Sequence, residues 1–275
     1  MHRRSCDGRP AAGGRRTGTR KLALDTDSEW AQFEQVQGEA PAIWRELRKR
    51  APEFFSAYAD LAAVPYRRGS LSPKARELVM LAVNSAVTHL YRDGMRHHMR
   101  NALKHGATEV EILEVLQLVS VLGIHAISIG FPAAQQIAKD LGRTDEIPPA
   151  ELTGEQADLK ERFRRARGYW TPFWEEVLKL DTPLFEAYYQ FSSVPWCHGV
   201  LEPKTREFIY IAIDASTTHM FDEGTRGHMA NAFNHGATLS EILEVLELTT
   251  TLGIQSATVG LEILLEETAA TEATQ

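Results

Sequence analysis

The pattern of hydrophobic and polar positions predicts helices throughout this chain, because no run alternates apolar and polar residues as a half-buried strand does. Ser72 and Pro73 form a typical helix start, and Gly106 follows the end of the next helix. Thr108 and Glu111 form a capping-box pattern that starts a further helix. The helices expected in the first half and just beyond it cover residues 40–50, 52–63, 72–91, 95–105, 109–122, 124–141 and 155–167, with a turn at 65–69.

The helix expected over residues 72–91 is apolar on every side between residues 78 and 83, which predicts a buried central helix. Polar and aromatic residues nevertheless recur on one face of it, at spacings of seven, four and three: Glu77, Asn84, Thr88 and Tyr91. A carboxylate on such a helix must be paired or must have a raised pKa. Glu77 is therefore a candidate for chemistry as well as for a structural role.

One long block occurs twice in the chain. Residues 41–130 align without a gap on residues 171–260, at a constant offset of 130, which indicates two copies of one module. The polar stripe recurs in the second copy as Glu207, Asp214, Thr218 and Phe221. Both copies keep the polar pairs Lys74/Lys204, Arg76/Arg206, Glu77/Glu207, Thr88/Thr218, His89/His219, Arg96/Arg226, His98/His228 and His105/His235. His97 and His125 become Gly227 and Gln255, so we expect them to be surface or neutral core residues.

Composition and charge bound the class of protein. Of 275 residues, 43% are hydrophobic and 24% charged, as in a globular protein, and the net charge is −7. Residues 1–21 carry seven Lys or Arg and one Asp, which leaves about −13 on the remainder and disfavours nucleic acid as a partner. No apolar run predicts a membrane span, and the basic segment lacks the apolar core of a secretory signal. With only Cys6 and Cys197, we expect no disulfide framework and a cytoplasmic protein.

These features predict the following organisation. We expect a disordered basic tail over residues 1–25, a first module over 26–141, a linker over 142–154, a second module over 155–268 and a frayed C-terminus over 269–275.

The repeated residues resemble those of a known family. The pattern P-K-x-R-E, an apolar helix, a His 21 residues after the Glu, and then N-A-[LF]-x-H-G-A-T-x-x-E-I-L-E-V-L is similar to the carboxymuconolactone decarboxylase family. The resemblance covers both modules and implies an all-α fold of two AhpD-like helical modules related by a pseudo-twofold axis. Because single-module members are commonly oligomeric, it also implies a homo-oligomer, either a trimer or a dimer of two-module chains.

The chain departs from the related AhpD-type alkylhydroperoxidases, which resemble this pattern but carry Cys-x-x-Cys followed by His on the central helix. Residues 88–92 here read THLYR, and residues 218–222 read THMFD. Thiol peroxidase chemistry needs a nucleophilic thiolate and usually a resolving partner. We therefore do not expect peroxidase activity.

The resemblance implies a lyase that needs no cofactor and acts on a small anionic lactone or keto acid. Such a site must hold a carboxylate, stabilise an enolate oxygen and deliver a proton to carbon. Arg96 could hold the carboxylate, His98 or His89 could serve the enolate or protonate carbon, and Glu77 could orient a His or shuttle the proton. The candidate catalytic residues are Glu77, His89, Arg96, His98, Glu207, His219, Arg226 and His228.

Structural interpretations remain open beside the catalytic one. His105 and His235 are expected to cap their helices, Arg76 could pair with an acidic residue, and Glu77 could be a structural carboxylate. A metal-dependent enzyme is an alternative, with Glu77, His89 and His98, and Glu207, His219 and His228, as ligands. A third possibility is a non-catalytic helical binding or scaffold module.

Overall fold

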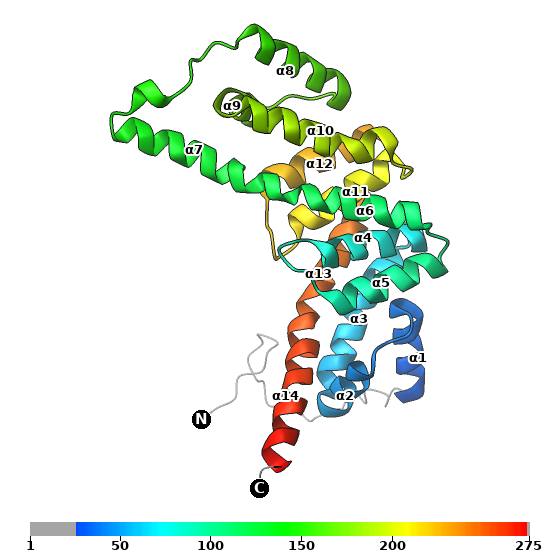
Figure 1. Ribbon diagram of the computed structural model, residues 1–275. Helices are drawn as coiled ribbons and strands as arrows, with labels where there is room; N and C mark the ends of the chain where they lie inside the picture. The colour runs from blue at the N-terminus through cyan, green and yellow to red at the C-terminus, as the bar shows by residue number, and fades with distance from the viewer. Residues whose placement is uncertain (1–25, 274–275) are drawn as a thin grey trace, which may run out of the picture. The chain divides into compact units, whose positions relative to one another are not determined.

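The computed structural model describes residues 26–273, and these are helical without a strand among them (Figure 1). The chain divides into two compact units, Met1–Pro41 and Ala42–Gln275. The described part of the first unit contains the helix α1 (Thr26–Gln37). The tail predicted over residues 1–25 lies outside the described residues.

The second unit contains both copies of the repeat. The first copy comprises α2 (Ala42–Arg50), α3 (Pro52–Arg68), α4 (Pro73–Ser85), α5 (Arg92–Lys104), α6 (Glu109–Ser120), the 3-10 turn η1 (Val121–Ile124) and α7 (His125–Asp140). The second comprises α9 (Pro172–Leu180), α10 (Thr182–His198), α11 (Pro203–Ala215), α12 (Asp222–Asn234), α13 (Leu239–Thr250), η3 (Thr251–Ile254) and α14 (Gln255–Ala273). Between them lie η2 (Thr144–Glu146) and α8 (Gly154–Arg167). The all-α fold of two tandem modules is confirmed.

The central helices α4 and α11 lie side by side in one core that both modules share (Figure 1). Their apolar segments, 78–83 and 208–213, are buried and contact apolar residues of α6 and α13. The prediction that these two helices are buried is therefore correct. Because the core is common, the two modules stabilise each other.

Reciprocal contacts relate the modules as a pseudo-twofold axis requires. Arg76 of the first module pairs with Glu244 of the second at 2.5 Å, and Arg206 of the second pairs with Glu114 of the first at 2.6 Å. The hydroxyl of Thr88 lies 3.5 Å from that of its copy, Thr218, which places these two loops together.

The central helices end earlier than the sequence predicts. α4 stops at Ser85 rather than near Tyr91, and α11 stops at Ala215. The chain then turns through Leu90 (φ 47°), while the amide of Tyr91 donates to the carbonyl of Asn84 at 3.0 Å. His89 and Tyr91 therefore lie in a loop, and the helical stripe extends only from Glu77 to Asn84. The copy at Met220 (φ 56°) makes the same turn.

Two further expectations about helix ends differ from the structure. The turn expected over residues 65–69 is helical to Arg68, with Pro65 inside α3 and Gly69 as its left-handed cap (φ 67°). The C-terminal residues 269–273, expected to be frayed, continue α14.

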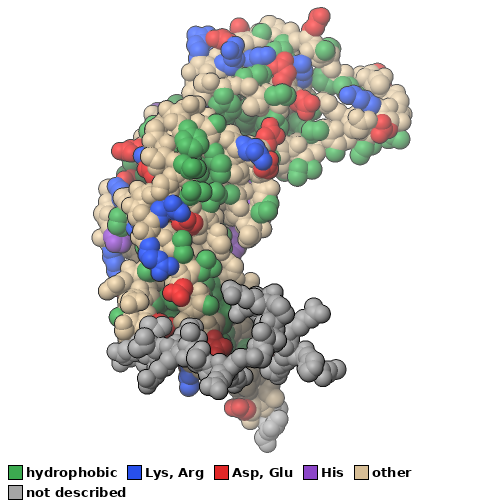
Figure 2. Space-filling view, turned by 180° about the vertical axis from the view of Figure 1, so that it is seen from behind, with side chains coloured by type: hydrophobic (Ala, Val, Ile, Leu, Met, Phe, Trp, Pro, Cys, Tyr) green, Lys and Arg blue, Asp and Glu red, His purple; other side chains and the backbone are tan. Residues whose placement is uncertain are grey.

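Two helical stretches, Glu109–Asp140 and Leu239–Ala273, are long and apolar enough to cross a membrane by length and composition, although the sequence pattern predicts no membrane span. Each contains a buried glutamate, Glu114 or Glu244, that is paired with an arginine of the other module. Their first halves contribute to the shared core, which is the position of a core helix in a soluble protein. On the face drawn in Figure 2, basic and acidic side chains are interspersed among hydrophobic ones.

Candidate functional site

A buried glutamate–histidine pair joins α4 to α5. His98 Nδ1 lies 2.8 Å from Glu77 Oε2, and the two side chains are only 10% and 6% exposed. Glu77 lies on the apolar central helix, and the turn after Ser85 returns the chain so that α5 packs against α4. The helix–turn–helix thus brings together two residues that are 21 positions apart.

The second module repeats this pair. His228 Nδ1 lies 2.7 Å from Glu207 Oε2. Glu207 is buried, while His228 is somewhat more exposed than His98 and stacks on the ring of Tyr210 at a centroid distance of 4.5 Å. In both modules the carboxylate holds Nδ1, so Nε2 is the ring atom turned away from it, and in the second module this Nε2 lies 3.9 Å from Asp214 Oδ2.

His89 belongs to a different hydrogen-bond network. Its Nε2 is 2.5 Å from Oε1 of Gln255, whose amide nitrogen donates to Asn84 Oδ1 at 2.8 Å. Asn84 in turn donates to the carbonyl of Met80. Because Gln255 begins α14, the second module completes the polar surroundings of the first.

The equivalent positions of the second module carry different chemistry. His219 Nε2 lies 2.6 Å from Nδ1 of His125, which begins α7 of the first module. Asp214 Oδ1 lies 3.9 Å from His125 Nδ1 and 4.0 Å from His219 Nε2. Burial raises the pKa of Asp214 to about 7, although His228 lowers it, and burial with the nearby His219 and His228 lowers the pKa of His125 to about 4. Burial also lowers the pKa of His219.

Two helical glycines set the spacing around these networks. A Cβ at Gly94 of α5 would overlap the side chain of Asn84, and a Cβ at Gly224 of α12 would overlap that of Asp214. The missing side chains let each helix pass close to the polar residue of the central helix.

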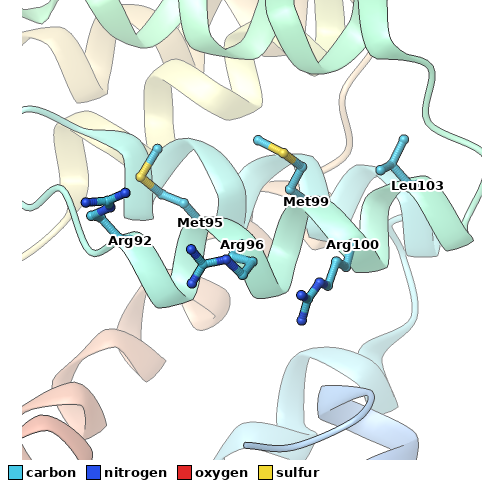
Figure 3. Close-up of a pocket in the computed structure, with 6 residues that line it drawn as sticks. All are labelled: Arg92, Met95, Arg96, Met99, Arg100 and Leu103. Carbon is cyan, nitrogen blue, oxygen red and sulfur yellow. The ribbon is translucent and has the colours of Figure 1, made fainter.

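Arg96 and Arg226 do not join the glutamate–histidine pairs. Arg96 donates to Asp93 at 2.9 Å and Arg226 donates to Asp222 at 2.7 Å, and all four side chains are more than half exposed. Arg96 instead borders an open groove of about 360 Å³ along α5 (Figure 3). Its lining residues are Arg92, Met95, Arg96, Met99, Arg100 and Leu103. Glu77 and His98 do not line it.

The structure changes several expectations about site residues. Arg76 does not compete for Glu77, because it pairs with Glu244 across the modules. Among the described residues, the predicted metal-ligand sets Glu77, His89, His98 and Glu207, His219, His228 do not form clusters with ligand spacing. The group that does is His125, Asp214 and His219.

Sequence reasoning missed three residues that the structure makes important. His125 was expected on the surface or in a neutral core because its copy is Gln255, yet both residues contact the histidine of the other module. Glu114 and Glu244 were not singled out, although each repeats inside an apolar helix, which is the signal that identified Glu77.

Comparisons with known proteins agree with this architecture. The sequence profile of the carboxymuconolactone decarboxylase family matches residues 52–139 and 183–265. The fold is similar to a crystal structure described as a candidate gamma-carboxymuconolactone decarboxylase subunit from Burkholderia xenovorans LB400, with a TM-score of 0.84 and 40% sequence identity. That match covers 90% of this chain and 98% of the other. A search of curated proteins gave no match.

The two profile matches fall on the two copies of the repeat, and each contains one glutamate–histidine pair. The chain therefore belongs to the carboxymuconolactone decarboxylase family.

Proposed function

We propose that the protein is a cofactor-free lyase that decarboxylates a small anionic lactone or keto acid by enolate stabilisation and proton transfer. The observation that carries this proposal is the buried Glu77–His98 pair, together with its copy Glu207–His228. A histidine whose Nδ1 is held by a carboxylate has a fixed orientation and tautomer, as a general acid or base requires.

The reaction sets what the pair must do. In γ-carboxymuconolactone, the bond to the departing carboxylate breaks and its electron pair moves through the C=C bond to the lactone carbonyl. Carbon dioxide leaves, and a dienolate with its negative charge on oxygen remains. The His98 imidazolium can donate Nε2–H to that oxygen and then transfer the proton to carbon, while Glu77 stabilises the positive ring.

The substrate carboxylates require a cationic partner. Arg96 is a repeated cation on the same helix as His98, and its present partner Asp93 is exposed, so that ion pair is weak and can exchange. We assign Arg96 and Arg226 the role of carboxylate binding, which brings the substrate to the N-terminal turns of α5 and α12. The dipole of each helix favours an anion there.

Turnover of γ-carboxymuconolactone tests the proposal. Purified protein, with no organic cofactor added, is expected to release carbon dioxide in proportion to the loss of the lactone, and R96Q/R226Q is expected to raise KM more than it lowers kcat. The matched control R68Q alters an arginine that pairs with Glu247 away from these helices. An absence of carbon dioxide release from this lactone and from a panel of β-keto acids would rule out the lyase.

Peroxide reduction with a dithiol donor is expected to stay at the background rate. Cys197 is exposed at the end of α10, Cys6 lies outside the described residues, and the loop around His89 has no thiol. A coupled peroxidase assay of the wild type and C197S checks this. Robust turnover that C197S abolishes would show that the protein uses thiol chemistry.

A further inference from the structure

Asp214 has a buried carboxylate whose hydrogen-bonding capacity is unsatisfied among the described residues. It is 1% exposed, and neither of its oxygens has a hydrogen-bond partner among the described residues. Three imidazoles, from His125, His219 and His228, lie 3.9 to 4.0 Å from its oxygens. A buried carboxylate normally gains hydrogen bonds or a cation.

The positions of three ligand atoms fit a metal ion. His125 Nδ1, His219 Nε2 and Asp214 Oδ1 form a triangle with sides of 2.6, 3.9 and 4.0 Å. The point equidistant from the three atoms is about 2.1 Å from each, which is the length of zinc–nitrogen and zinc–oxygen bonds. The three atoms come from three elements, namely α7, α11 and the loop before α12.

The first module provides an internal comparison. Around His89, the copy of His219, the equivalent positions carry Asn84 of the first module and Gln255 of the second in place of Asp214 and His125. There Gln255 bonds both His89 and Asn84, and Asn84 donates to the carbonyl of Met80, so the polar groups satisfy one another. Neutral amides are weak ligands for transition metals, whereas imidazole and carboxylate are strong ones. The two modules therefore differ in the two residues that decide between a closed amide network and a ligand set.

We propose that His125, Asp214 and His219 form a binding site for a first-row transition metal ion such as Zn²⁺, present in the second module and replaced by an amide network in the first. The site lies beside the Glu207–His228 pair and uses a residue from each module. The site goes beyond the proposed function, because that function uses the Glu77–His98 pair and its copy Glu207–His228 and not these three ligands.

The donor types select the kind of ion. Two imidazoles and one carboxylate suit Zn²⁺, Co²⁺, Fe²⁺ or Mn²⁺ better than Ca²⁺ or Mg²⁺, which prefer oxygen ligands. Three protein ligands leave at least one position for water or substrate. His228 approaches the other carboxylate oxygen, Oδ2, and its Nδ1 is held by Glu207, so it is placed outside the ligand triangle.

The close approach of His125 and His219 is consistent with a site that opens on binding. At 2.6 Å the two ring nitrogens share a hydrogen bond, whereas tetrahedral ligation with bonds near 2.0 Å separates two nitrogens by about 3.3 Å. A small rotation of the two rings replaces the shared proton with the ion.

Metal titration of the full chain tests the proposal. Protein without an affinity tag is stripped with a chelator, dialysed and titrated with Zn²⁺ by calorimetry, and its bound metal is counted by elemental analysis. We expect one Zn²⁺ per chain, and Co²⁺ in its place is expected to give the visible absorption bands of a four-coordinate site. Stripped wild-type protein that binds no Zn²⁺ would overturn the proposal.

Exchanges between the modules provide matched controls. H125Q/D214N gives the site around His219 the residues found around His89, and this variant is expected to bind Zn²⁺ at least 100-fold more weakly. The reverse exchange, N84D/Q255H, is expected to raise the count to two ions. H219Q is expected to lose the ion while its copy H89Q keeps it, with circular dichroism showing that each variant is folded. Zn²⁺ binding of wild-type strength in folded H125Q/D214N would place the ion elsewhere and contradict the assignment.

Discussion

Replacing His98 and His228 together by glutamine is expected to lower kcat for lactone decarboxylation by about 10² to 10⁴-fold, the usual contribution of a general acid or base. This corresponds to about 3 to 5.5 kcal/mol of transition-state stabilisation. Glutamine can still donate to Glu77 and Glu207, so the buried carboxylates keep a partner. The loss of activity then reports on the imidazole and its Nε2, and kcat and KM measured with γ-carboxymuconolactone check it.

A second pair of repeated histidines is the control. His105 and His235 are exposed at the ends of α5 and α12, where their backbone amides, not their rings, satisfy the helix ends. H105Q/H235Q is therefore expected to keep kcat within about twofold, as surface substitutions outside a site usually do. A folded H98Q/H228Q protein with normal kcat would remove these histidines from the mechanism. If that variant is unfolded, the single variants H98Q and H228Q separate the contribution of each site.

Replacing Glu244 by alanine is expected to cost about 3 to 5 kcal/mol of unfolding free energy, because it breaks a buried ion pair from one side. Glu244 is fully buried, pairs with Arg76 and accepts from the backbone amides of Ser70 at 2.6 Å and Leu71 at 3.1 Å. Its loss leaves a buried guanidinium and two amides without their acceptor. Urea unfolding followed by circular dichroism measures the change.

The reciprocal contact, between Arg206 of the second module and Glu114 of the first, is expected to stabilise the fold to a similar extent. Glu114 pairs with Arg206 and accepts from the amides of Val200 at 2.5 Å and Leu201 at 2.8 Å. E114A/E244A removes both contacts and is expected to leave no folded protein, since total stabilities are about 5 to 15 kcal/mol. D222A, which removes the exposed partner of Arg226, is expected to leave the unfolding midpoint unchanged. If E244A unfolds at the same urea concentration as D222A, the cross-module pair is not a stabilising contact.

The sequence was sufficient to predict the helices and one contact of the site. The gapless repeat predicts two equivalent modules, and the apolar run over residues 78–83 predicts a buried helix. On that helix, the physical cost of an unpaired carboxylate predicts a partner for Glu77, and the repeated His98 proves to be that partner. These inferences depend on the local pattern of apolar and polar residues, from which the burial of a helix can be predicted in a single sequence.

The remaining features depend on contacts between segments that are far apart in the sequence. The end of α4 at Ser85 is set by a turn in which Leu90 adopts a positive φ, and neither residue is a glycine that would indicate it. Likewise, a periodic pattern cannot show that His125 of the first module contacts His219 of the second. Because Gln255 occupies the equivalent position in the second copy, the repeat predicts a neutral role for His125.

The joining of both modules in one chain has a consequence for how such a protein can evolve. In an assembly of two identical polypeptides, every substitution appears on both sides of the axis, so both sites change together. Here residues 84 and 214, or 125 and 255, are encoded separately and have become different. Fusion therefore permits the residues of one site to be retained while those of its twin change, and the reciprocal arginine–glutamate contacts hold the diverging halves together.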